Sequence, residues 1–279
     1  MDSPWYHPLR MSRPASRRHF LGTLAAASQL PGAAYVNPRK ALLWESTRKE
    51  FREALESGAL QAMIVPTGST EQHNEHLAMI NDTASVTLIA QQAALQLWPR
   101  VMVATPVPVG ISPHWMDRKG TLTLKRETFL AVVYEICESL VQHGVKRILI
   151  LNGHGGNVAP LRQSVAGFRE KLGIRVEFNS YWDAYKPDII KRYMESGRAP
   201  GHAGEFETSF ALAAFPERIH WDNVNYERDK SKFGIKDPAS AKQEEEFARD
   251  AKLASAAKGE AMISIAADWV AGRLREMIS

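Results

Sequence analysis

The sequence predicts an α/β fold whose central sheet is mostly parallel, with helices on both faces of the sheet. Three observations support this prediction: short apolar runs of strand length, intervening segments with apolar residues at helical spacing, and glycines where those segments end. Parallel strands joined by helical crossovers place helices on both sides of a sheet. With 279 residues, of which 44% are hydrophobic and 24% charged, the chain is long enough to bury a sizeable core.

Four apolar runs have the length and composition of buried parallel strands. The first covers 62–66 and is interrupted by Gly68, and the second covers 101–104. The third, 145–152, is the clearest because four aliphatic residues follow one another at its centre, and the fourth covers 174–178. These runs are the expected strands of the sheet.

The segments between these runs have apolar residues three or four positions apart, as amphipathic helices do. Two of them stop at Gly144 and Gly173, and a glycine after the last turn is a common helix stop signal. The C-terminal stretch 241–278 is rich in Ala, Glu and Lys and predicts one or two further helices. The helices expected between the strands cover 82–98, 126–143 and 158–172.

Residues 1–34 are typical of a targeting segment that is not part of the fold. The run Ser16-Arg17-Arg18-His19-Phe20-Leu21 resembles a twin-arginine export signal, and a weakly apolar stretch and small residues at 32–34 follow it. The alternative is a disordered basic tail. We expect one domain over 35–279, in a protein that is periplasmic or exported, or cytoplasmic if the leader is not functional. The chain contains no run of about 18 apolar residues, so we expect no stable membrane insertion once the leader is removed.

Composition argues against two classes of function. The net charge is +4, but residues 1–34 hold four arginines against the single carboxylate of Asp2, so the rest of the chain is about neutral. No basic face with interleaved aromatic residues emerges, which argues against a nucleic-acid partner. The one cysteine, Cys137, lies in an apolar helical pattern, where a thiol is usually a small buried hydrophobe and not a nucleophile.

The first of three segments rich in histidine and carboxylate begins where the first strand ends, and reactive residues gather at the carboxyl ends of such strands. Glu71 and His73 are two positions apart, so both side chains point to one face of an extended backbone. With Asp82 they form a mixed ligand set that suits zinc or manganese. The alternative is a polar surface loop in which Asp82 caps the helix that follows.

The other two segments follow the same pattern. His154 stands among glycines after the third strand, in a sequence that matches neither of the common phosphate-binding glycine loops and contains no basic residue. His202, Glu205 and Glu207 stand at the entrance to an apolar helical run, where the two glutamates could simply favour the positive end of that helix. Five of the nine histidines fall in or near the three segments: His73, His76, His114, His154 and His202.

Taken together, these segments resemble the creatininase (creatinine amidohydrolase) family over roughly residues 40–225. The resemblance implies a three-layer α/β/α fold, a pair of divalent ions (zinc, manganese or iron) and a homo-oligomer, often a hexamer. The motifs that carry it are Glu71-Gln72-His73 with His76 and Asp82, Asn152-Gly153-His154-Gly155-Gly156-Asn157, His202-Ala203-Gly204 with Glu207-Thr208-Ser209, and Gly110-Ile111-Ser112-Pro113-His114-Trp115 with Gly120-Thr121.

Carried over by position, the resemblance implies two ligand sets that share one carboxylate. Glu71, Asp82 and His154 would hold one ion, and His73, Asp82 and Glu207 would hold the other. Creatininase itself has a metal-binding glutamate two residues after the histidine that matches His154, whereas this chain has Gly156 there. Because of this departure, we expect Glu207 to supply the carboxylate for the second ion. The departure also favours a substrate other than creatinine, namely a related amide or formamide.

The expected function is hydrolysis of a C–N amide bond, in a cyclic amide or a formamide, by a hydroxide that two metal ions activate. His202 is the expected proton donor to the departing nitrogen. Glu205, or alternatively His76, is expected to orient a ligand imidazole. Trp115 and Trp182 either line the pocket or, more in keeping with their type, belong to the core.

Two other functions are compatible with these segments. A metal-dependent phosphoesterase would also use clustered His and Asp, but it should have Arg or Lys near them, and only Arg118 and Lys119 come close. An exported, non-catalytic protein that binds a metal or small ligand could keep the same fold. Retention of every expected ligand type argues against this second alternative.

Overall fold

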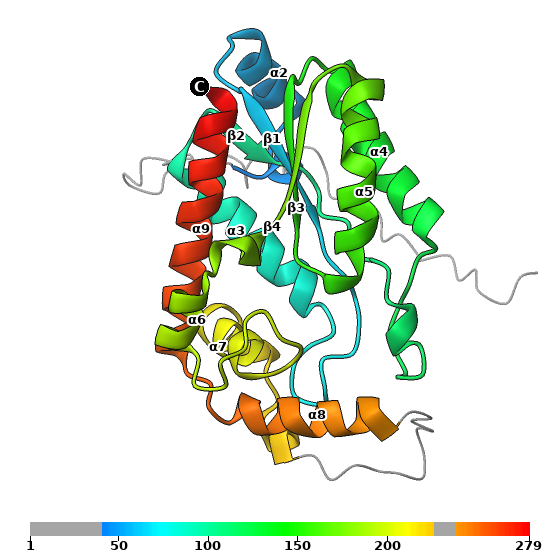
Figure 1. Ribbon diagram of the computed structural model, residues 1–279. Coiled ribbons are helices and arrows are strands. Elements are labelled where there is room, and N and C mark those ends of the chain that lie inside the picture. Colours follow the sequence, from blue (N-terminus) through cyan, green and yellow to red (C-terminus); the bar gives the residue numbers. More distant parts are fainter. Residues whose placement is uncertain (1–40, 226–237) are drawn as a thin grey trace, which may run out of the picture. The chain divides into compact units, whose positions relative to one another are not determined.

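The computed structural model describes residues 41–225 and 238–279 and contains a four-stranded sheet in which all strands are parallel. The strand order is β2-β1-β3-β4, so the first and third strands lie at the centre (Figure 1). Ile64 pairs with Val103 on one side and with Leu149 on the other, and this register brings the carboxyl ends of the strands to one edge. The strands are β1 (Ala62–Thr67), β2 (Val101–Val103), β3 (Arg147–Asn152) and β4 (Arg175–Ser180).

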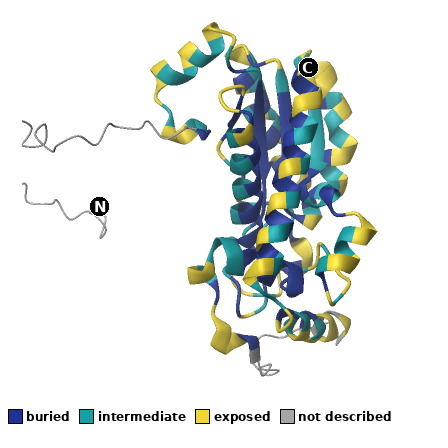
Figure 2. Cartoon of the chain, turned by 90° about the vertical axis from the view of Figure 1, so that its left-hand side faces the viewer, coloured by how far each residue is buried: buried dark blue, intermediate teal, exposed yellow. Residues whose placement is uncertain are grey.

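Side chains of the strands alternate between two hydrophobic cores, one on each face of the sheet. Ala62 and Ile64 of β1 join the core under α3, α7 and α9, whereas Met63 and Val65 join the core under α4 and α5. Figure 2 shows the strands as the most buried part of the described chain. The predicted α/β fold with helices on both faces is thereby confirmed. The helices are α2 (Arg48–Glu56), α3 (Asn81–Gln96), α4 (Arg126–Gln142), α5 (Val158–Leu172), α6 (Pro187–Tyr193), α7 (Glu205–Ala214), α8 (Pro238–Ala251) and α9 (Ala256–Ile278).

The glycine stop signals lie where the sequence predicts them. Gly144 follows α4 with φ of +106°, and Gly173 ends α5 with φ of +63°, a region that residues with a side chain rarely adopt. The C-terminal stretch forms two helices, α8 and α9. Helices α2 and α6 are not among the predicted elements. A capping box marks the start of α2, because Thr47 and Glu50 bond to each other's backbone N–H groups.

Two further predictions concern the periphery of the fold. The targeting segment at 1–34 lies outside the described residues, so the leader and the domain boundary at residue 35 remain predictions. None of the described helices combines the length and the apolarity that crossing a membrane requires.

Cys137 is fully buried on α4, and burial raises the pKa of its thiol to about 12.

Candidate metal centre

The three segments rich in histidine and carboxylate meet at the carboxyl edge of the sheet. The loop after β1 supplies Glu71 and His73, the loop after β3 supplies His154, and the first turn of α7 supplies Glu207. Gly153 allows the end of β3 to approach α3, since a Cβ there would lie 2.8 Å from the carbonyl oxygen of Asp82. Segments more than a hundred residues apart in the sequence therefore converge on one site.

Asp82 lies between two imidazoles at the centre of this site. Its Oδ1 is 3.0 Å from His73 Nε2, and its Oδ2 is 2.9 Å from His154 Nδ1. Burial alone would raise the pKa of Asp82, but the two imidazoles hold it well below its ordinary value. Helix α3 begins at Asn81 without a side-chain cap, so the alternative that Asp82 is a helix cap is wrong.

Two further carboxylates complete two groups of potential ligands. The ligand atoms of Glu71, Asp82 and His154 lie within 4.8 Å of one another, and so do those of His73, Asp82 and Glu207. All five side chains are buried. Glu71 Oε2 has no hydrogen-bond partner although it is inaccessible to solvent. Three buried carboxylates facing two imidazoles, with one oxygen unsatisfied, fit divalent cations and are costly without them.

Both imidazoles are oriented by backbone carbonyl groups. His73 Nδ1 donates to the carbonyl of Glu71 at 3.1 Å, which leaves Nε2 facing Asp82. His154 Nε2 donates to the carbonyl of Ile111 at 3.0 Å, which leaves Nδ1 facing the site. Histidines that bind metal usually donate their other N–H group to a carbonyl or carboxylate in this way. Each imidazole therefore presents the nitrogen that a metal would need.

The carboxylates of the site have unusual proton affinities. Burial raises the pKa of Glu207 to about 7, despite the nearby His73, and burial also raises the pKa of Glu71. Burial would lower the pKa of His73, but Asp82 and Glu207 raise it to about 10. The site thus holds protons that divalent ions would displace.

The backbone around Gly156 leaves no room for a side chain at this position. A Cβ at this position would lie 1.9 Å from the carbonyl oxygen of Ile111 and 2.6 Å from His154 Nε2. No side chain fits there without moving the group that orients His154. Glu207 instead points into the site from α7, with its Oε2 accepting from the backbone N–H of Ala203 at 2.6 Å.

His202, the expected proton donor, lies half-buried beside the two ligand groups. Its ring stacks on Trp115 at 4.7 Å between centroids and lies 4.5 Å from the ring of His73. Its Nδ1 is 3.7 Å from Glu71 Oε1, and Gln72 contacts its Nε2 at 2.9 Å. Burial and the nearby His73 lower the pKa of His202 well below its ordinary value, so the imidazole is neutral near pH 7.

Glu205 does not contact the imidazoles of this site. Its carboxylate accepts from the backbone N–H groups of Glu195 and Ser196 and from Lys258 Nζ at 2.5 Å. The orienting role expected for Glu205 is therefore corrected: the residue ties the start of α7 to a neighbouring loop and to α9.

His76, the alternative for the same role, makes its hydrogen bond to a residue other than the two ligand histidines. It bonds to Thr208 Oγ1 at 2.9 Å, and burial together with His73 lowers its pKa to about 4. The orienting groups are instead the carbonyls of Glu71 and Ile111, which no side-chain pattern in the sequence reveals.

A cavity of about 810 Å³ opens onto the two ligand groups. Trp115 and Trp182 both line it, although Trp115 is buried and Trp182 also packs against the core. Helix α8 crosses this edge of the molecule and supplies two lining residues that the sequence did not reveal, because they are far from the motifs (Figure 1). Beyond the ligands and His202, the lining side chains include His114, Trp115, Trp182, Arg198, Gln243 and Phe247.

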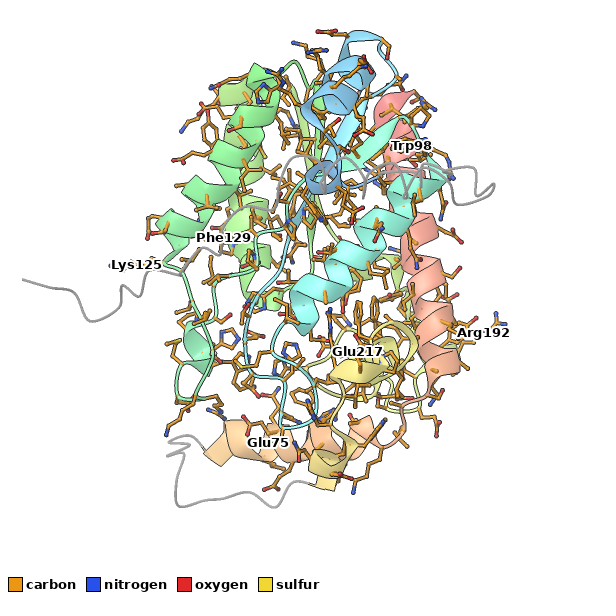
Figure 3. The ribbon with its side chains drawn as sticks, turned by 180° about the vertical axis from the view of Figure 1, so that it is seen from behind. Glu75, Trp98, Lys125, Phe129, Arg192 and Glu217 are labelled. Carbon is orange, nitrogen blue, oxygen red and sulfur yellow. The ribbon has the colours of Figure 1, made fainter. Side chains whose placement is uncertain are left out.

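Arg118, which lies near the motifs in the sequence, is already engaged. Arg118 donates to Glu244 of α8 at 2.8 Å and is also paired with its neighbour Asp117. Asn74 donates to the carbonyl of Glu244 at 3.3 Å, and Figure 3 accordingly shows the neighbouring Glu75 beside α8. Arg118 thus links the loop beside the site to α8, which gives no support to a phosphoesterase.

Comparison with known proteins relates the chain to one family. The family model described as creatinine amidohydrolase (Creatininase) matches residues 44–274. The 3-dehydro-scyllo-inosose hydrolase of Thermotoga maritima is 33% identical over 180 residues, which are 62% of this chain and 56% of that protein. The creatinine amidohydrolase of Pseudomonas putida is 28% identical over 256 residues, 83% of this chain and 95% of that protein. A crystal structure of creatinine amidohydrolase superposes with a TM-score of 0.74 at 27% identity, over 86% of this chain and 98% of the other.

Proposed function

The chain belongs to the creatininase family, and from this premise we propose that it is a metal-dependent amidohydrolase that hydrolyses a C–N amide bond of a small molecule. The observation that supports this most is the position of Asp82, whose two oxygens face the imidazoles of two separate ligand groups. A single carboxylate shared in this way suits a pair of metal ions. Relatives that are themselves named hydrolases agree with the proposal.

The residues that would hold the metal ions are those of the two ligand groups. Glu71, Asp82 and His154 would hold one ion, and His73, Asp82 and Glu207 the other. Mixed oxygen and nitrogen ligands accept several first-row ions, of which zinc is our first choice and manganese or iron the alternatives. Bound ions would polarise the carbonyl oxygen of the amide and lower the pKa of a water molecule to near neutrality.

The other residues of the site would bind and orient the substrate. His202 faces the cavity with a neutral imidazole, and we assign it the role of donor toward the departing group. Trp115 and Phe247 pack against this imidazole, at 4.7 Å and 5.9 Å between ring centroids, and shield it from water. Shielding strengthens the hydrogen bonds that the site forms with the reacting amide.

The cavity suits a small molecule, since its volume of about 810 Å³ falls in the usual range for ligand pockets. By the resemblance, Gly156 stands where creatininase has a metal-binding glutamate, so we propose a cyclic amide other than creatinine, or a formamide, as the substrate class. A homo-oligomer, and export through a twin-arginine leader, also remain proposals that rest on the sequence.

The test measures metal content first and turnover second. We expect about two ions per chain by mass spectrometry, and chelator-sensitive hydrolysis within a panel of formamides, cyclic amides including creatinine, and an aryl phosphate. His202→Gln should keep both ions and lose most turnover, whereas His143→Gln, at an exposed position directly after α4, should change neither. No bound metal would overturn the ligand assignment. Metal with no turnover would favour a binding protein, and turnover of the aryl phosphate alone would favour a phosphoesterase.

A further inference from the structure

A third imidazole, that of His202, lies beside the two ligand groups of the candidate metal centre. It could act either as a metal ligand or as a hydrogen-bond donor. The ligand atoms of Glu71, His73 and His202 also lie within 4.8 Å of one another, so His202 is near enough to be a metal ligand. A neutral imidazole has one N–H group and one lone pair. Whether His202 can bind metal therefore depends on which of its nitrogens is protonated.

The side-chain amide of Gln72 fixes this choice. Its Oε1 accepts from the backbone N–H of Asn74 at 2.9 Å, which identifies the oxygen side of the amide. Its Nε2 must then be the atom that lies 2.9 Å from His202 Nε2. An amide nitrogen only donates, so the lone pair of His202 is on Nε2 and is used by this bond. The remaining proton is on Nδ1, 3.7 Å from Glu71 Oε1.

The partners of the three imidazoles differ in a way that matches their roles. His73 and His154 donate to carbonyl oxygens, so the other nitrogen of each ring faces Asp82 and would offer a lone pair to a metal that displaces its proton. His202 accepts from an amide, and therefore turns an N–H group toward the site. The backbone N–H of Gln72 also donates to Thr121 Oγ1 at 3.1 Å, which holds the glutamine in place.

We propose that Gln72 is a positioning residue, whose amide holds His202 as the tautomer protonated on Nδ1 and so makes it a neutral hydrogen-bond donor to the reacting amide, not a metal ligand. The inference rests on the proposed function of the site. It refines the donor role of His202, because this tautomer has no free lone pair with which to collect a proton from water. His202 then stabilises negative charge that develops on the substrate, as hydrogen-bond donors of this kind do.

Magic-angle-spinning NMR of protein labelled with ¹⁵N-histidine tests the proposal, because protonated and unprotonated ring nitrogens resonate in separate regions. The spectra are recorded on the protein as purified and after addition of Zn²⁺, and His202→Gln identifies the signals. We expect Nδ1 of His202 to be protonated and Nε2 unprotonated in both states. A protonated Nε2, or a zinc-dependent shift of either nitrogen of His202, would overturn the proposal.

Two variants separate positioning from mere packing. Gln72→Glu replaces the donor by an acceptor, so His202 should move its proton to Nε2 and turn a lone pair toward the metal centre. Gln72→Met has similar length but neither donates nor accepts, so both tautomers should appear. We expect Gln72→Glu to lower kcat about 100-fold with little change in KM. An unchanged tautomer in Gln72→Glu would contradict the proposal.

The NMR readout requires neither turnover nor bound metal. A failure of the proposed hydrolase function would leave the tautomer measurement intact, and a wrong tautomer would leave the metal ligands intact. The two proposals can therefore fail separately.

Discussion

Gly156 faces the carbonyl oxygen of Ile111 so closely that a Cβ on the glycine would lie 1.9 Å from that oxygen. The same carbonyl accepts a hydrogen bond from His154. Close packing and the orientation of a proposed metal ligand thus depend on one backbone contact.

Gly156→Ala should consequently disturb both stability and metal binding. Overpacking of this kind lowers the free energy of unfolding by roughly 1–3 kcal/mol, and displacement of Ile111 should weaken zinc affinity. Urea denaturation and zinc titration measure the two effects. Gly155→Ala is the matched control, because a Cβ there meets nothing within 4 Å. Equal stability of the two variants would show that position 156 tolerates a side chain.

Substitution of the shared carboxylate should remove more metal than substitution of any other ligand. We expect Asp82→Asn to lose both ions, since Asp82 belongs to both ligand groups, whereas Glu207→Gln should keep about one ion per chain. Mass spectrometry of the purified variants gives the stoichiometry. Glu75→Gln, an exposed position in the same loop, should keep both ions. Retention of two ions by Asp82→Asn would remove Asp82 from its proposed shared position.

Metal binding should release protons and weaken as the pH falls. The pKa of His73 is about 10, because Asp82 and Glu207 outweigh the effect of burial, so the imidazole is protonated at pH 7 without metal. An ion that binds Nε2 must displace that proton, and each displaced proton makes the affinity fall about tenfold per unit decrease in pH. Calorimetry in two buffers of different ionisation enthalpy counts the protons. The absence of proton release at pH 7 would exclude His73 as a ligand.

The ion pair between Glu205 and Lys258 should contribute stability near neutral pH and lose it in acid. Burial raises the pKa of Glu205, but the bonds from Lys258 and Ser196 lower it below its ordinary value of 4.5. The contribution is therefore present above that value and is lost as the pH falls through the lower, folded-state pKa. At the basic end, the pKa of Lys258 is raised, so the contribution is lost only as the pH rises through that raised value.

Glu205→Gln tests this pair. We expect it to lower the free energy of unfolding at pH 7 by about 2 kcal/mol, with the difference from the wild type shrinking toward pH 3. Glu195→Gln is the control, because Glu195 also contacts Lys258, at 2.7 Å, but its side chain is 67% exposed and should contribute less than about 1 kcal/mol. Urea denaturation across pH gives both curves. A difference that grows in acid would contradict the assignment.

The sequence predicts the sheet well because its strands have local signals. The aliphatic run in β3 and the glycines after α4 and α5 are each visible within a few residues. Helix α2 was not predicted, although Thr47 and Glu50 provide a capping signal, because it is short and only three of its nine residues are apolar.

The candidate site was only partly predictable for a different reason. The residue types of the proposed ligands can be recognised in short motifs, and the structure brings those five side chains together. The role expected for Glu205 failed because its partner Lys258 is 53 residues away along the chain. The part of the cavity wall that α8 forms was not predicted either, because Phe247 lies far along the chain from the motifs.

Cys137 provides a practical handle for studying this site. It is the only cysteine in the chain, it is fully buried, and its thiol has a pKa of about 12. Maleimide reagents, which require an accessible thiolate, should therefore leave the native protein unlabelled. A cysteine introduced at the exposed position 75 would then be the single labelled site, next to α8, without removal of any native residue. A fluorophore there would report ligand entry, because the native thiol of Cys137 would not react with the label.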